Sequence, residues 1–215
     1  KFNRTILKVF GDAKIPVVLL DSDFVASPSR SEYDLVGVDN TNVGYALAQH
    51  VIAAGAKRLI YFSNPLPAPT SLKRGTGVGV AVTEAGLKWT KDRVFFADPE
   101  DTRAAERLFR SAKRPDAIIA VNDYIAAKLL KTLKAIGKRV PEDVLLAGVN
   151  GDPVAEESDP PLTTMSQPCE RIGEAAVHLM FQRLADPDLP PRTIQLSAQL
   201  KERVSTRRRQ KSQNG

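Results

Sequence analysis

The stretch AIIAVNDYIAAKLLKTLKAIGKRVPEDVLLAGVN, residues 117–150, decides the fold class. Two short apolar runs, 117–121 and 144–149, frame it, and each runs directly into an asparagine, Asn122 or Asn150. Between them, residues 124–136 have the apolar period of an amphipathic helix, and Gly137 stands where a helix commonly ends. A buried strand, a helix and another buried strand predict one unit of a parallel sheet covered by helices.

The same alternation continues on both sides of this stretch and predicts an α/β fold with parallel sheets flanked by helices. Further strands are expected at 16–20, 35–38, 59–62, 94–97, 194–196 and 200–204, and further helices at about 43–54, 71–85, 102–112 and 168–184. The proline-rich segment 63–69 and the segment 153–161 are expected to be loops.

Composition indicates a folded globular protein without metal or disulfide chemistry. Of the 215 residues, 42% are hydrophobic and 26% charged, which is ordinary for a chain that buries a core. The single cysteine, Cys169, excludes an internal disulfide and fits a reducing compartment. His50 and His178 are far apart and have no ligand-like spacing, so we expect no zinc and no other metal.

The net charge of +6 is concentrated at the end of the chain. Four of the 31 Lys and Arg residues lie within residues 207–215, and without them 27 basic residues stand against 25 acidic ones. We therefore expect a nearly neutral folded body and a disordered basic tail at 207–215. No apolar run reaches the roughly 18 residues that cross a bilayer and no secretion signal opens the chain, so we expect a cytoplasmic protein without membrane contact.

Polar residues follow several of the expected strands. Asp21, Asn122 and Asn150 come directly after apolar runs, and Arg74 lies early in the helix that follows the strand at 59–62. Ligands of parallel sheets bind at the carboxyl ends of strands, and carboxylate, amide and guanidinium groups suit a ligand rich in hydroxyls or carrying an anion, such as a sugar. The alternative is that these residues form turns and cap helices.

The sequence offers no catalytic constellation. Gly75, Gly77 and Gly79 resemble a nucleotide-binding loop, but they lie in a helical stretch and lack the order Gly-x-Gly-x-x-Gly after a strand. No Gly-x-Ser-x-Gly elbow is present, and the paired acids Glu156 and Glu157 lie in a polar segment where solvation is expected. We therefore expect a binding protein that is not an enzyme and has no cofactor.

The order of these motifs resembles the LacI/GalR family of transcription regulators, from about residue 15 to 206. The segments that carry the resemblance are IPVVLLD (15–21), VGVDNTNVGYALAQHVIAAGAKRLIYF (36–62), SLKRGTGV (71–78), PDAIIAVNDYIA (115–126), GKRVPEDVLLAGVNGDP (137–153) and PPLTTMSQP (160–168). The last two together are the most specific.

The resemblance implies a periplasmic-binding-protein-like core of two lobes that hold an effector in the cleft between them. An N-terminal-type lobe would comprise 1–38 and 166–197, and a C-terminal-type lobe 39–165 and 198–206. Effector-contacting positions of the family fall on Asp21, Arg74, Asn122 and Asn150. A pocket position falls on Cys169, and Val38 and Tyr124 lie near the pocket.

The sequence also departs from the family pattern. The family usually has Asp where Asn150 stands, so the sugar specificity of other members does not transfer. The helix-turn-helix head, the hinge helix and the first units of the N-terminal-type lobe do not precede Lys1, so we expect an N-terminally truncated chain that does not bind DNA alone. In the intact regulator, which would be a homodimer, effector-driven closure of the lobes would change binding to operator DNA. The alternative is an exported periplasmic solute-binding protein for a sugar transporter.

Overall fold

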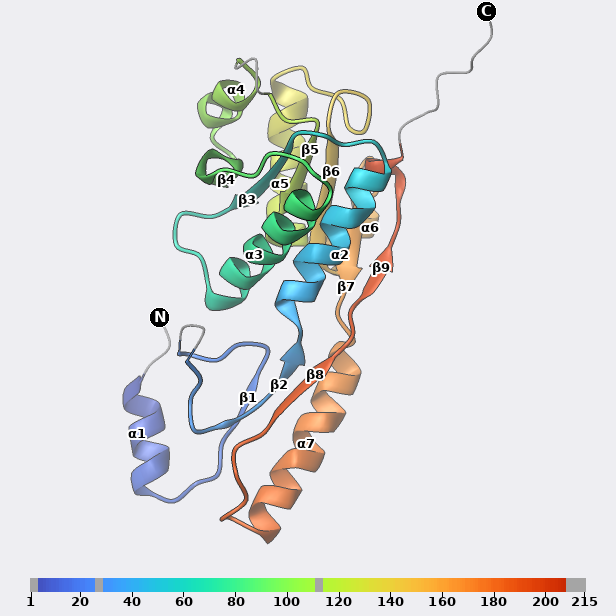
Figure 1. Ribbon diagram of the computed structural model, residues 1–215. Helices are drawn as coiled ribbons and strands as arrows, with labels where there is room; N and C mark the ends of the chain where they lie inside the picture. Colours follow the sequence, from blue (N-terminus) through green and yellow to red (C-terminus); the bar gives the residue numbers. More distant parts are fainter. Residues whose placement is uncertain (1–3, 26–28, 111–113, 208–215) are drawn as a thin grey trace, which may run out of the picture. The chain divides into compact units, whose positions relative to one another are not determined.

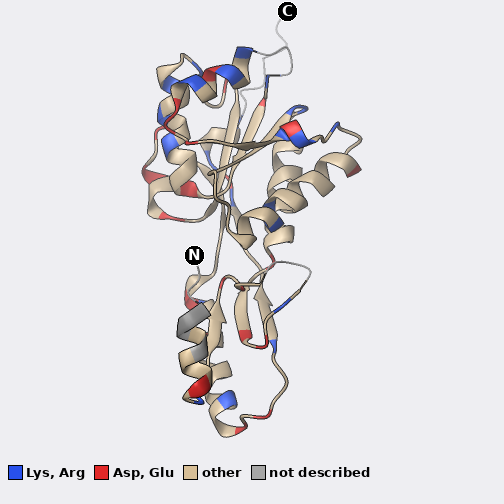
Figure 2. Ribbon diagram, turned by 90° about the vertical axis from the view of Figure 1, so that its left-hand side faces the viewer, with Lys and Arg blue, Asp and Glu red and all other residues tan. Residues whose placement is uncertain are grey.

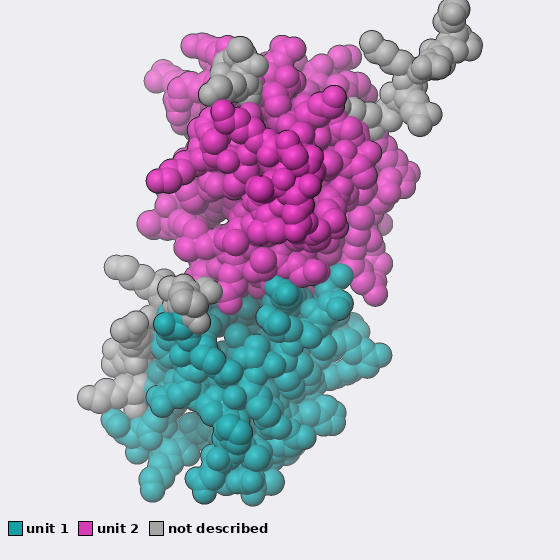
Figure 3. Space-filling model, in the orientation of Figure 1, with its two compact units in different colours: residues 1–39, 168–198 teal, residues 40–167, 199–215 magenta. Residues whose placement is uncertain are grey.

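The computed structural model describes residues 4–25, 29–110 and 114–207 and divides the chain into two compact units (Figures 1 and 3). Unit 1 comprises residues 1–39 and 168–198, and unit 2 comprises residues 40–167 and 199–215. The expected α/β class is confirmed in both units, because each has a mainly parallel sheet with helices packed on it. Most of the tail at 207–215, for which disorder is expected, lies outside the described residues.

The sheet of unit 2 has the strand order β4-β3-β5-β6-β7-β9. Its neighbouring strands are parallel except for the antiparallel pair β7 and β9. In register, Leu59 lies opposite Ala117, and Ala117 lies opposite Leu145, so the three central strands run in step toward one carboxyl edge. The strands are β3 (Leu59–Ser63), β4 (Val94–Phe96), β5 (Ala117–Ala120), β6 (Leu145–Asn150), β7 (Thr163–Ser166) and β9 (Gln199–Lys201).

One face of this sheet is covered by α4 (Thr102–Arg110), α5 (Asp123–Ala135) and the short α6 (Pro153–Glu157). Successive residues of a strand point to opposite faces, and Ile60, Ile118 and Leu146 accordingly pack in one buried cluster with the apolar side chains of these helices. α6 lies within the segment 153–161 that we expected to be a loop, so this expectation is wrong in part. Pro153 favours the helix because its fixed φ suits the first helical turn.

The other face carries α2 (Asn40–Ala53) over β5, β6 and β7, and α3 (Pro69–Glu84) over β3 (Figure 1). The two helices approach backbone to backbone. A Cβ atom on Gly44 would overlap the main chain of Arg74, and one on Gly77 would overlap the carbonyl oxygen of Thr41. The neighbouring Gly75 packs against the ring of Tyr61. The alternating glycines of α3 are therefore packing positions.

The described residues include two short 3₁₀ helices, η1 (Lys91–Arg93) and η2 (Val204–Thr206). The strand expected at 200–204 is wrong in part, because β9 ends at Lys201 and η2 begins at Val204. Ser205 and Thr206 are buried in η2 and bond to the sheet. The Ser205 hydroxyl donates to the carbonyl oxygen of Leu146 at 2.6 Å, and the hydroxyl oxygens of Thr206 and Thr163 lie 2.7 Å apart. These polar contacts require a turn at 204–206 rather than a continued strand.

Unit 1 has a three-stranded parallel sheet of order β1-β2-β8, formed by β1 (Val18–Leu20), β2 (Asp34–Val38) and β8 (Thr193–Leu196). Its helices are α1 (Arg4–Asp12), which the sequence analysis did not predict, and α7 (Cys169–Ala185), which lies along all three strands.

A buried ion pair joins α7 to the start of β2. Arg183 donates from Nε to Asp34 Oδ2 at 3.0 Å and from Nη2 to Asp34 Oδ1 at 3.1 Å, and the main chain of Arg192 donates to the same carboxylate at 2.7 Å. Burial alone would raise the pKa of Asp34, but hydrogen bonds from Arg183 and Arg192 hold it below its ordinary value. Arg183 also donates to the carbonyl oxygens of Pro187 and Pro190, so it holds the connection between α7 and β8.

None of the helices within the described ranges is long and apolar enough to cross a membrane.

Because α2 and α3 approach so closely, adding a methyl group at Gly77 should destabilise the fold. We expect Gly77→Ala to lower the free energy of unfolding by about 1–3 kcal/mol, because the helices must separate. Gly173→Ala is the matched control, since Gly173 lies inside α7 with no atom near its missing side chain. It should raise stability by about 0.5–1 kcal/mol. Urea unfolding followed by circular dichroism measures both, and equal stabilities would contradict the packing explanation.

Candidate functional site

The carboxyl edge of the sheet in unit 2 carries three of the predicted site residues. Asn150 is the last residue of β6, Asn122 follows β5, and Arg74 lies in α3, the helix that follows β3. β5 and β6 are neighbours in the sheet and end side by side, and the Arg74 guanidinium reaches the end of β5 because it donates to the carbonyl oxygen of Val121. The structure thus brings these residues to one edge.

Arg74 is buried, with 5% of its surface exposed, and its guanidinium binds protein groups. Nε donates to Oδ1 of Asn40 at 2.7 Å, and Nη1 donates to the carbonyl oxygen of Val121 at 2.7 Å. Arg74 therefore ties α2 and α3 to the end of β5. Removing its side chain would leave buried acceptors unsatisfied, which costs about 1–3 kcal/mol for each group.

Asn122 is the N-cap residue of α5. Its Oδ1 accepts a hydrogen bond from the main chain of Ile125 at 2.8 Å, and so satisfies one of the free N–H groups of the first turn. The capping role that the sequence left open is thus present at Asn122. Capping also holds the side chain in a defined orientation at the sheet edge.

Asn150 has a positive φ of 119°, which is rare for a residue with a side chain. Its Nδ2 donates to Oδ2 of Asp152 at 3.1 Å, and its Oδ1 accepts from Nε2 of Gln167 at 2.9 Å. The carboxamide therefore acts as donor and acceptor at once. An aspartate at this position would place a carboxylate against Asp152 and lose the donor, so the exchange between Asn and Asp is not neutral here.

Asp123 was missed by the sequence analysis, although it directly follows Asn122. It is fully buried, and its Oδ2 accepts three hydrogen bonds: from the main chain of Gly151 at 2.8 Å, from that of Asp152 at 2.9 Å and from the hydroxyl of Thr164 at 2.9 Å. One carboxylate thus joins the start of α5 to the turn after β6 and to the second residue of β7. Burial raises the pKa of Asp123 to about 6, although these hydrogen bonds oppose the shift. The sequence does contain a signal for Asp123. Asn122 alone is enough to cap α5, so a second polar residue directly after it indicates another role.

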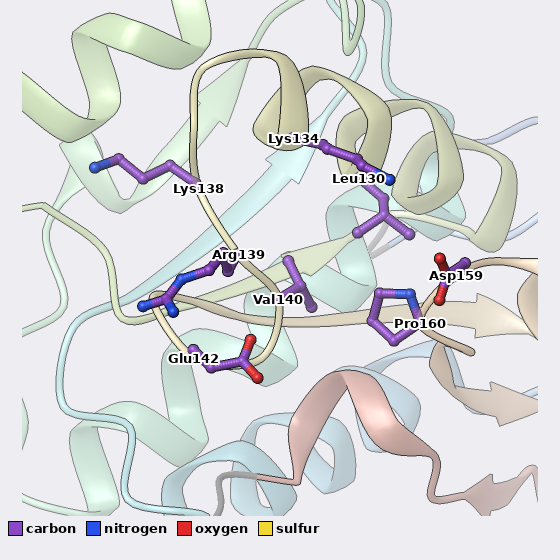
Figure 4. A pocket seen from close by; sticks show the side chains of 8 residues that line it. All are labelled: Leu130, Lys134, Lys138, Arg139, Val140, Glu142, Asp159 and Pro160. Atoms are coloured by element: carbon purple, nitrogen blue, oxygen red, sulfur yellow. The ribbon is translucent and has the colours of Figure 1, made fainter.

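Tyr124 lies in the first turn of α5, directly after Asn122 and Asp123. It is 58% exposed and lines a surface hollow of about 470 Å³ between α5 and α6, together with Lys131 and Val154. A neighbouring hollow of about 240 Å³ lies at the end of α5; Figure 4 shows its lining residues, which are Leu130, Lys134, Lys138, Arg139, Val140, Glu142, Asp159 and Pro160. Both linings consist of residues other than Arg74, Asn122 and Asn150.

The other predicted site residues, Asp21, Val38 and Cys169, lie in unit 1. Asp21 follows β1 with a positive φ of 62°, and its buried Oδ1 has no hydrogen-bond partner among the described residues. Val38 ends β2 and is buried, and Cys169 is the exposed first residue of α7.

Charged residues of both signs alternate along the helices of unit 2 (Figure 2). Exposed pairs such as Arg110 with Glu106 and Arg139 with Asp143 neutralise one another locally and contribute little to stability. Across the described ranges, no group of three or more His, Cys, Asp or Glu residues is placed to hold a metal ion.

Comparison with known proteins gives one consistent result. A model of the periplasmic binding protein-like domain matches residues 48–206. The HTH-type transcriptional repressor PurR of Mannheimia succiniciproducens is 30% identical over 209 residues, which are 96% of this chain and 61% of that protein. Among the most similar curated relatives, the chain spans between 53% and 61% of their length.

Two solved structures are similar over most of the chain. The transcriptional regulator CelR in complex with cellobiose is 26% identical with a TM-score of 0.83, and the alignment covers 94% of this chain and 62% of that one. A LacI family transcriptional regulator from Enterococcus faecalis V583 with bound ribose is 26% identical with a TM-score of 0.77, covering 94% and 73%.

The raised pKa of Asp123 predicts a pH effect on stability. The folded protein binds this proton more tightly than the unfolded chain, whose pKa is 3.8, so the stabilisation is complete below about pH 4 and is lost as the pH rises through about 6. The free energy of unfolding of the wild type relative to Asp123→Asn should therefore fall by about 3 kcal/mol over this window.

Asp143→Asn is the control for this measurement, because hydrogen bonds from Arg139 lower the pKa of Asp143 to about 2. Its stabilisation is lost only as the pH falls toward 2, so the control should follow the wild type between pH 4 and 7. Urea unfolding at half-unit pH steps measures both differences. A constant difference between the wild type and Asp123→Asn would contradict the shift.

Proposed function

Since this chain belongs to the periplasmic binding protein-like domain family, in its LacI/GalR regulator branch, we propose that it senses a small polar effector, a sugar or sugar derivative, for a transcription regulator. The observation that carries the proposal is the row of polar groups at the carboxyl edge of unit 2. There the guanidinium of Arg74 and the carboxamide of Asn122 lie at the end of β5, and the carboxamide of Asn150 lies at the end of the neighbouring strand β6.

The chemistry of this edge suits hydroxyl groups. The Asn150 carboxamide is held in a fixed orientation by Asp152 and Gln167, and beyond these two bonds it keeps a second N–H donor and a second acceptor lone pair, which suit a sugar hydroxyl. Two similar regulators were solved with sugars, cellobiose and ribose, and this supports the same ligand class here.

The arrangement supports binding rather than catalysis. Asp123 is the carboxyl group with a raised pKa at this edge, but its side chain is fully buried: Oδ2 accepts from three donors of the protein, and Oδ1 lies buried against Gly148. A general base needs an oxygen that reaches the proton it removes. The relatives are regulators, in line with a non-enzymatic role.

We further propose that Asp21, Val38 and Cys169 of unit 1 and Tyr124 of unit 2 contribute to the effector site, with unit 1 as the N-terminal-type lobe and unit 2 as the C-terminal-type lobe. The regulator would act in the cytoplasm as a homodimer and bind operator DNA through a helix-turn-helix head. The relatives favour this account over an exported solute-binding protein. The upstream gene sequence tests it: a helix-turn-helix reading frame supports the regulator, and a signal peptide would contradict it.

A thermal-shift screen with cellobiose, ribose, sugar phosphates and nucleobases tests the ligand class. A ligand at about 100 times its dissociation constant adds roughly 2.7 kcal/mol to stability, which raises the melting temperature by several degrees. We expect a sugar to give the largest shift. A shift with nucleobases alone would contradict the proposed class.

For the sugar that shifts most, Asn150→Gly should reduce the shift by at least half, because it removes the carboxamide while glycine accepts the positive φ. Gln49→Ala is the control, since Gln49 is an exposed amide on α2 that bonds to Tyr45. An equal shift in both variants would remove Asn150 from the site. Arg74→Ala is less informative, because its buried hydrogen bonds also stabilise the fold.

A further inference from the structure

The carboxylate of Asp123 has an unequal environment at its two oxygens. Oδ2 accepts from the main chain of Gly151 and Asp152 and from the hydroxyl of Thr164, whereas Oδ1 is buried without a hydrogen-bond partner among the described residues. Gly148 makes this possible, because a Cβ atom there would overlap Oδ1. A buried oxygen without a hydrogen-bond partner lowers the stability of the fold, so we ask what the carboxylate contributes at this position.

The two main-chain donors directly follow Asn150. Asn150 and Gly151 both have positive φ, 119° and 79°, and this turn is therefore held away from ordinary backbone geometry. The carboxylate binds the N–H groups of Gly151 and Asp152, and Asp152 in turn accepts from the Asn150 side chain. Asp123 thus fixes the backbone that orients the Asn150 carboxamide.

We propose that Asp123 is a positioning residue that holds the turn 150–152, and with it the Asn150 carboxamide, and that protonation of the Asp123 carboxyl group releases this turn. That the positioning serves effector binding rests on the proposed function. The release of the turn does not.

The groups that face the Asp123 carboxyl group determine the pH at which the turn 150–152 is released, and this pH is weakly acidic. Burial and the negative charge of Asp152 raise the pKa of Asp123, the three donors lower it, and the result is about 6. β7 presents the hydroxyl of Thr164 and β6 presents Gly148, and neither ionises in this range. On the α3 side, Arg74 donates to the main chain of Val121. Hydrogen bonds to an ionised carboxylate are about twice as strong as those to a neutral group, so while Asp123 stays buried the turn opens locally more readily below about pH 6 than above it, even though protonation stabilises the folded protein against global unfolding.

Amide hydrogen exchange followed by NMR tests the proposal without any ligand. After correction for intrinsic rates, the protection of the Gly151 and Asp152 amides in the wild type should be about tenfold lower at pH 5 than at pH 7.5. In Asp123→Asn it should be low at both pH values. The Val121 amide, which bonds to Phe62 across the sheet, serves as an internal reference. Asp143→Asn should reproduce the wild-type profile.

Thr164→Val provides a second variant in case Asp123→Asn does not fold. It removes one donor to the carboxylate, which favours the neutral form and moves the transition of the Asp152 amide to higher pH. The Asp152 amide is the readout because Gly151 also donates to the Thr164 hydroxyl, at 3.2 Å. An unshifted transition in Thr164→Val, or equal wild-type protection at pH 5 and 7.5, would overturn the proposal.

The exchange experiment and the sugar screen fail independently. A normal pH profile without any sugar shift would contradict the proposed ligand class and leave the turn release intact. A thermal shift with a sugar, together with amide protection that does not change with pH, would support the proposed ligand class and contradict the release of the turn.

Discussion

Strands that end together at one edge of a sheet leave main-chain groups that no neighbouring strand satisfies, and the candidate site of unit 2 depends on how these groups are paired. Arg74 donates to the carbonyl oxygen of Val121, Asn122 accepts from the main chain of Ile125, and Asp123 accepts from the turn after β6. The polar residues of the proposed effector site therefore also hold the sheet edge together. A side chain fixed in this way loses little freedom when a ligand binds.

The close packing of α2 and α3 on one face of the sheet places Arg74 at this edge. Gly44 lets α2 lie directly against the main chain of Arg74, and Asn40 of α2 accepts from the Arg74 guanidinium. A larger residue at position 44 would push α3 away and carry Arg74 with it. The glycines that resemble a nucleotide loop in the sequence thus belong to the same packing arrangement as the site.

The asparagine at position 150 fits its surroundings better than an aspartate would. Asp152 and Asp123 already supply two carboxyl groups to this turn, and the Asn150 amide donates to Asp152. A third carboxylate would add like-charge repulsion beside a buried acid. The side chain at position 150 consequently has a donor that an aspartate lacks.

The sequence by itself determined the alternation of strands and helices, the α/β class and the placement of Asn122 and Asn150 at strand ends, because these follow from the spacing of apolar residues a few positions apart. Its motif order also indicated the family. Only the tertiary structure decided that Asp123 is buried and that Asp34 pairs with Arg183, 149 residues away. It also decided that the backbones of α2 and α3 come into direct contact at Gly44 and Gly77. Each depends on which distant segments meet. A residue's burial, pKa and hydrogen-bond partners are set by that meeting, whereas its secondary structure is set largely by its neighbours in the chain.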